Sequence, residues 1–135
     1  MTAAKGKTIL VVDDDPALQL FVGTALRIAG YNVEQCLESR QAVDKVRRTA
    51  PDLVILDVMM ERGTSGFDIA QQLRRDPATA RLPILMLSAI HKTTRLRFSP
   101  DTDGEYLPVD EFVNKPVTAD ELLAKVEKLL ADRRE

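Results

Sequence analysis

The chain has 135 residues, and its 19 Lys and Arg against 21 Asp and Glu give a formal net charge of −2. This length supports one domain, and 44% hydrophobic and 30% charged residues exclude a disordered chain. The weakly acidic balance gives no electrostatic footprint for nucleic acid, and the single cysteine excludes an internal disulfide or a multi-thiolate metal site.

The apolar runs of the sequence are short. Asp13 ends the run Ile9–Val12 after four residues, which is too short for the core of a signal peptide. No run approaches the roughly 18 residues needed to span a bilayer. We therefore expect a cytoplasmic protein without a membrane partner, in which residues 1–7 form a tail, residues 8–133 form one domain and no output domain follows. A fragment of a longer protein would look the same.

The first strand and the first helix have clear signals. Ile9–Val12 is apolar on both faces, as is typical of a strand buried between helix layers. Positions 17–29 have apolar residues at helical spacing, with Pro16 in the first turn and Gly30 as the terminator.

The remaining segments continue this alternation of strands and helices. The stretch 91–110 is the least regular, with at most a short helix near its start, because prolines and acidic residues interrupt it. The other expected elements, in chain order, are a strand at Tyr31–Cys36, a helix at Ser39–Thr49, a strand at Leu53–Leu56, a helix at Gly66–Arg75, a strand at Pro83–Leu87, a strand at Glu111–Asn114 and a helix from the capping box Thr118–Glu121 to Leu130. Five strands alternating with about five helices predict an α/β fold with a parallel sheet.

Polar side chains follow four of these strands. Ligands bind beyond the carboxyl ends of the strands in open α/β sheets, so these side chains are candidates for one site. Carboxylate oxygens suit a hard cation such as Mg²⁺. A polar residue after a buried strand is also common, because loops are polar. Asp14 or Asp15 could simply cap the helix that follows. The residues concerned are Asp13, Asp14, Asp57, Ser88 and Lys115.

Four segments together resemble the receiver domain of two-component response regulators. They span nearly the whole chain, and their joint occurrence is highly specific. The resemblance implies a flavodoxin-like, doubly wound sheet with strand order 2-1-3-4-5. The segments are Ile9–Pro16, Val54–Met60, Leu87–Ala89 and Phe112–Pro116.

The resemblance also implies a metal site and a phosphoryl acceptor. Asp57 would accept the phosphoryl group. Asp14 would hold Mg²⁺, with Asp13 contributing directly or through water, together with Asp57 and the backbone carbonyl of Met59. The protein would be a signalling switch that catalyses only its own phosphorylation and dephosphorylation.

Four further positions would support the acceptor. Ser88 would hydrogen-bond the phosphoryl oxygens and Lys115 would pair with them. The Lys115–Pro116 peptide bond would be cis, and Phe112 would be an aromatic switch that couples the site to a protein-binding face.

The resemblance implies partners as well. These are a sensor histidine kinase or phosphotransfer protein and a downstream protein target that binds the helix 4–strand 5–helix 5 face. Nucleic acid is not expected to bind directly, and homodimer formation is left open. The kinase, the target, the signal and the lifetime of the phosphoryl group are not readable from the sequence.

Two segments depart from the family pattern. Glu61–Gly66 lacks the usual proline and has one additional residue and a serine before the glycine, which is either a change of access to the site or a tolerated loop variation. The stretch 91–110 is several residues longer than usual, and its Phe98, Tyr106 and Leu107 would either dock a partner or fill space over the sheet.

Two other functions fit parts of the sequence. Asp13–Asp15 loosely satisfies the Asp-x-Asp spacing of haloacid-dehalogenase-like phosphatases, in which Asp13 would be the nucleophile. The short chain, without a cap insertion, counts against this reading. The third hypothesis is a pseudo-receiver, an interaction module that works without phosphorylation.

Overall fold

The computed structural model describes residues 6–57, 66–89 and 109–132. Strands and helices alternate along them, as the sequence predicts. The elements are β1 (Thr8–Val12), α1 (Pro16–Ile28), β2 (Asn32–Cys36), the 3-10 turn η1 (Ser39–Gln41), α2 (Ala42–Thr49), β3 (Leu53–Asp57), α3 (Gly66–Arg75), β4 (Ile84–Ala89), β5 (Glu111–Lys115) and α5 (Ala119–Asp132).

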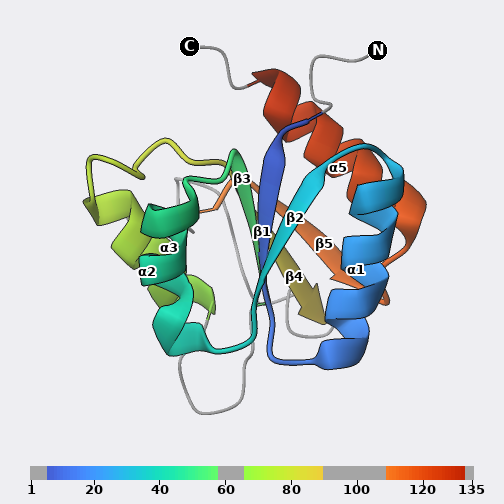
Figure 1. Cartoon of the computed structure of the whole chain (residues 1–135), viewed down its shortest axis with the longest axis horizontal. Helices are drawn as coiled ribbons and strands as arrows, with labels where there is room; N and C mark the ends of the chain where they lie inside the picture. Colours follow the sequence, from blue (N-terminus) through green and yellow to red (C-terminus); the bar gives the residue numbers. More distant parts are fainter. Residues whose placement is uncertain (1–5, 58–65, 90–108, 133–135) are drawn as a thin grey trace, which may run out of the picture.

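The strands form one five-stranded sheet in the order β2-β1-β3-β4-β5, with every neighbouring pair parallel. α1 and α5 cover one face, and α2 and α3 cover the other (Figure 1). This confirms the predicted doubly wound, flavodoxin-like fold. The described residues contain four α-helices against about five expected, and most of the irregular 91–110 stretch lies outside them. Across the described ranges, no helix combines the length and apolar character needed to cross a membrane.

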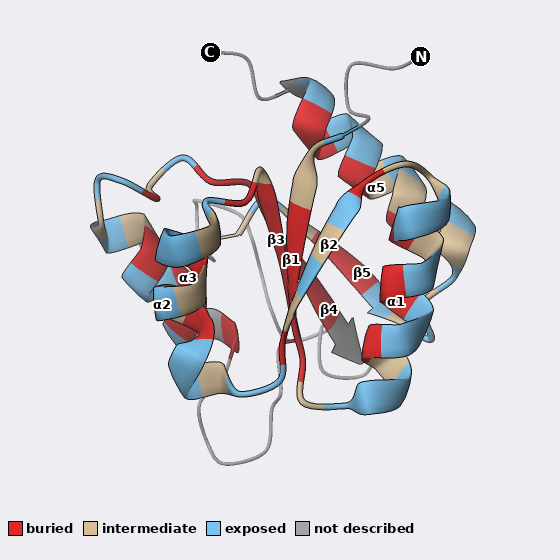
Figure 2. Ribbon diagram, viewed as in Figure 1, coloured by how far each residue is buried: buried red, intermediate tan, exposed pale blue. Residues whose placement is uncertain are grey.

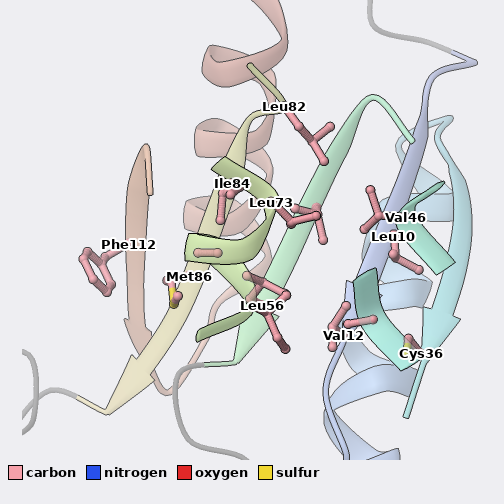
Figure 3. Packing of buried hydrophobic residues seen from close by; sticks show 14 residues of the cluster. Leu10, Val12, Cys36, Val46, Leu56, Leu73, Leu82, Ile84, Met86 and Phe112 are labelled. Carbon is pink, nitrogen blue, oxygen red and sulfur yellow. The ribbon is translucent and has the colours of Figure 1, made fainter. Parts of the chain in front are cut away.

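The core is divided into two layers by the alternation of side chains along the strands. Ile9 and Val11 face α1 and α5, whereas Leu10 and Val12 face α2 and α3. All four are fully buried, which explains why β1 is apolar at every position. The central strands are accordingly buried along their length, while the outer surfaces of the helices are exposed (Figure 2). Figure 3 shows the α2–α3 layer, in which side chains from both helices pack on the sheet.

The ends of α1 follow the sequence signals. The Asp15 carboxylate accepts a hydrogen bond from the Ala17 backbone N–H at 3.0 Å, which caps the helix directly before Pro16. Gly30 follows the helix with a φ of 105°, a left-handed conformation that glycine adopts without steric penalty.

The second predicted helix is shorter than the sequence suggests. Residues Ser39–Gln41 form a 3-10 turn, and α2 begins at Ala42. The helix ends at Thr49, and the next residue, Ala50, has a φ of 47° and precedes Pro51. Proline disfavours a right-handed helical conformation in the preceding residue, so the predicted stop is confirmed with a left-handed residue in place of a glycine.

Arg74 fastens the end of α3 to the sheet. Its guanidinium donates to the carbonyl oxygen of Leu82 at 2.7 Å and to the Asp110 carboxylate at 2.8 Å. The same Asp110 oxygen accepts the Ile84 backbone N–H at 2.8 Å. These bonds fix the start of β4 beside the residue that leads into β5, and so set the course of the strand that ends at Lys115.

Candidate functional site

Three carboxylates meet at the carboxyl ends of the two central strands. Asp13 and Asp14 follow β1, and Asp57 is the last residue of β3. One oxygen from each carboxylate lies within 4.8 Å of the other two. The topology places them together because β1 and β3 are parallel neighbours, so their carboxyl ends lie at the same sheet edge.

Asp13 has no exposed surface. Its Oδ1 accepts the Asp15 backbone N–H at 2.9 Å, whereas its Oδ2 is buried without a hydrogen-bond partner in the described part of the chain. Burial raises the pKa of Asp13 from 3.8 to about 6, and the neighbouring charges of Asp57 and Asp14 act in the same direction. The Asp15 N–H and the Lys115 ammonium lower this pKa and offset part of the rise.

The helix cap and the site use different aspartates. Asp15 caps α1 and is exposed. Asp14 is half-buried and belongs to the carboxylate cluster. The ambiguity over which aspartate caps the helix is therefore resolved in favour of Asp15.

Lys115 completes the cluster from β5. Its Nζ lies 2.9 Å from Oδ1 of Asp57. The Asp57 side chain is 6% exposed and that of Lys115 is 34% exposed, so the ion pair is screened from water mainly on the aspartate side. The Lys115–Pro116 peptide bond is cis, as predicted from the resemblance.

The other predicted site residues are less fully placed. Ser88 lies in β4 with its backbone paired to Asn114, and its side chain is outside the part that the structure describes. Met59 and positions 61–65 also lie outside the described residues. Phe112 is buried in the layer of the core on the α2–α3 side, and its ring lies near Met86 (Figure 3). Its predicted role as a switch, like the assigned roles of Ser88 and Met59, stays a prediction.

Two residues contact the backbone at the site but were assigned no role from the sequence. Gly66, the first residue of α3, lies so close to β3 that a Cβ atom there would overlap the Asp57 carbonyl oxygen and lie 3.1 Å from its carbonyl carbon. Gln19 is 2% exposed on the inner face of α1. The only sequence signal for Gln19 is a polar residue that lies one helical turn before Val22 and two turns before Leu26, both apolar.

Comparison with known proteins identifies the family. The family model described as "Response regulator receiver domain" matches residues 9–127. The chain belongs to the response regulator receiver domain family. This explains why the acidic cluster, the lysine at the end of β5 and the 2-1-3-4-5 sheet occur together.

Relatives of known name support the assignment. The chain is 36% identical over 122 residues to the DNA-binding dual master transcriptional regulator RpaA of Synechocystis. The alignment covers 90% of this chain and 48% of RpaA. It is 34% identical over 125 residues to the phosphate regulon transcriptional regulatory protein PhoB of Pseudomonas aeruginosa. This alignment covers 93% of the chain and 52% of PhoB. The chain therefore spans about half the length of these curated relatives.

Solved structures show the same fold. The chemotaxis response regulator CheY4 of Vibrio cholerae has 27% identity and a TM-score of 0.76, with 93% of this chain and 99% of CheY4 covered. A chain described as a response regulator from Chloroflexus aurantiacus has 30% identity and a TM-score of 0.80, with 94% and 99% covered.

The relatives correct one expectation. The sequence argument excluded nucleic acid as a direct partner, whereas RpaA is named as DNA-binding and PhoB as a transcriptional regulator. The net charge of −2 was a wrong basis for the exclusion, because it describes a chain that spans only about half of each relative. A net charge describes only the segment over which it is counted.

Proposed function

We propose that this receiver domain accepts a phosphoryl group on Asp57, with a Mg²⁺ ion held by Asp13, Asp14 and Asp57. The observation that carries the proposal is the convergence of three carboxylates and the Lys115 ammonium at the end of β3. The Lys115 ammonium lies 2.9 Å from the nearly buried Asp57 carboxylate, and this ion pair holds the carboxylate in place.

The acidic cluster fits a hard divalent cation. Three carboxylates within 4.8 Å of one another repel unless a cation or a proton offsets their charge. Within the described ranges, Oδ2 of Asp13 is buried without a hydrogen-bond partner, and a cation or its bound water would satisfy this oxygen. Mg²⁺ prefers oxygen ligands and binds through few carboxylates while keeping several waters. When bound, the ion would offset negative charge on the phosphoryl oxygens during transfer.

The side chains of the chain would carry out the rest of the transfer. A carboxylate oxygen of Asp57 forms a bond to the phosphorus atom, while the bond from phosphorus to the donor breaks and the donor leaves with its electron pair. The Lys115 ammonium lies where it would stabilise the charge on the transferred group. In a histidine kinase the breaking bond is the phosphorus–nitrogen bond of phosphohistidine. Hydrolysis of the resulting acyl phosphate would reset the switch.

The phosphatase alternative fits this geometry poorly. Asp13 would have to be the nucleophile, yet it has no exposed surface and its Oδ1 is bonded to the Asp15 N–H. Because the pKa of Asp13 is raised, a smaller fraction of it is ionised and nucleophilic below about pH 6 than of an ordinary aspartate.

Labelling with a small phosphodonor tests the proposal. The chain is incubated with Mg²⁺ and acetyl phosphate, the acyl phosphate is trapped with borohydride, and the labelled residue is mapped by mass spectrometry. We expect label at Asp57 that depends on Mg²⁺ and disappears in Asp57→Asn. Asp44→Asn, an exposed aspartate on α2, is the matched control and should label normally.

The same experiment separates the alternatives. Label at Asp13 with rapid turnover would overturn the proposal in favour of a phosphatase. Mg²⁺ binding without any label would overturn it in favour of a pseudo-receiver.

A further inference from the structure

Gln19 is a buried polar side chain on a helix face that is otherwise apolar. It is 2% exposed, and the next residues on the same face of α1, Val22 and Leu26, are fully buried in the α1–α5 layer of the core. Burying an amide in such a layer costs free energy unless its polar atoms are paired. The position therefore calls for a reason beyond packing.

The amide nitrogen of Gln19 lies among three backbone carbonyls. Nε2 donates to the carbonyl oxygens of Val11 at 2.9 Å, Asp13 at 3.0 Å and Cys36 at 3.1 Å. The Asp13 backbone N–H donates to the same Cys36 oxygen at 3.0 Å. One side chain of α1 thus ties the end of β1 to the end of β2.

These bonds hold the backbone of Asp13 on both sides of its Cα atom. The N–H is fixed by Cys36 and the C=O by Gln19, so the point from which the carboxylate projects has little freedom to move. Asp14 follows directly after the carbonyl that Gln19 holds. The amide therefore fixes the origin of two of the three clustered carboxylates.

The other half of the amide argues against a purely stabilising role. Oε1 of Gln19 is buried and has no hydrogen-bond partner among the residues that the structure describes. An unpaired buried acceptor is destabilising, so an apolar side chain of similar shape would avoid part of this penalty. The geometry therefore favours a role that depends on the hydrogen bonds donated by Nε2 and not on a net gain in stability.

We propose that Gln19 is a positioning residue for the Mg²⁺ site, which acts through the backbone of Asp13 and does not touch the ion. The inference rests on the proposed function, because that function requires Asp13 and Asp14 to bind Mg²⁺. Groups that hold metal ligands in place commonly contribute roughly 10- to 100-fold to metal affinity.

Two variants test this inference. Gln19→Met keeps the length and volume of the side chain and removes the donor. Val22→Ala is the matched control, since it creates a cavity one turn further along the same buried face and leaves the amide in place.

The readouts are Mg²⁺ affinity by calorimetry with the ion alone, free energy of unfolding in urea, and hydrogen exchange of the Asp13 amide. We expect Gln19→Met to weaken Mg²⁺ binding by roughly 10-fold or more and to speed exchange at Asp13. Val22→Ala should lower stability while Mg²⁺ affinity stays at the wild-type value.

Each outcome decides between the two proposals. If Gln19→Met bound Mg²⁺ as tightly as the wild type, or if Val22→Ala weakened binding equally, the positioning role would be overturned. If the wild type bound Mg²⁺ but Asp57 took no label, the proposed function would fail and the positioning role would still be judged by Mg²⁺ affinity. A wild type that bound no Mg²⁺ would overturn both.

Discussion

Asp13→Asn should make the metal-free protein more stable at neutral pH, although it removes a residue of the site. The carboxyl is fully buried, its Oδ2 has no hydrogen-bond partner among the described residues, and its pKa is raised from 3.8 to about 6. The neutral asparagine keeps the shape of the side chain and an oxygen that can accept the Asp15 N–H.

The size of the effect follows from the shift in pKa. A rise of about 2 units corresponds to about 3 kcal/mol of penalty for the ionised form. The pKa of the folded state lies above that of the unfolded state, so stability falls as pH rises from about 4 to about 6, and the full penalty is present above that range. The new amide N–H group needs an acceptor, which the neighbouring carboxylates offer, so we expect a net gain of about 1–3 kcal/mol.

The assay is urea unfolding followed by circular dichroism, in EDTA, near pH 7.5 and near pH 4. Asp13→Asn should gain stability near pH 7.5 and lose most of that gain near pH 4, where the wild-type carboxyl is already protonated. Adding Mg²⁺ should stabilise the wild type more than it stabilises Asp13→Asn, which keeps only two of the three clustered carboxylates. Glu34→Gln, an exposed charge on β2, is the control and should change stability by less than about 0.5 kcal/mol.

The reasoning would be refuted if Asp13→Asn were less stable than the wild type near pH 7.5 without Mg²⁺. A gain in stability that did not change with pH would also contradict it, because the penalty would then have another cause than the charge of Asp13.

Two further predictions concern the same sheet edge. The Mg²⁺ affinity of the wild type should be constant above about pH 6 and fall by up to about 10-fold per pH unit below it, because a proton on Asp13 competes with the ion. Calorimetry at several pH values measures this affinity. A constant affinity down to pH 5 would contradict the prediction. Gly66→Ala should destabilise the fold by about 1–3 kcal/mol and slow labelling of Asp57, because the added Cβ would displace α3 from the Asp57 carbonyl. Urea unfolding and acetyl phosphate labelling test the second prediction, with Gln71→Ala on the exposed surface of α3 as the control, and unchanged values in Gly66→Ala would disprove the close contact.

Much of the architecture was predictable because it depends on local patterns. The alternation of apolar runs with helical spacing led to the five-stranded parallel sheet, and Pro16, Gly30 and Pro51 marked helix ends at or close to the observed ones. The candidate site was predictable from one topological rule, since Asp13, Asp57 and the other polar residues come directly at strand ends. The cis bond before Pro116 came from the resemblance alone.

What the sequence by itself determined, then, is which carboxylates and which lysine come together, and the sheet edge at which they lie. Tertiary structure alone decided which aspartate caps α1, how close Lys115 lies to Asp57, and that Gly66 and Gln19 lie against the backbones of Asp57 and Asp13. The physical reason is that hydrophobic periodicity is written in neighbouring residues, whereas these contacts join segments far apart in the chain. The pKa of Asp13 likewise arises only when folding removes the carboxyl from water and brings two other carboxylates beside it.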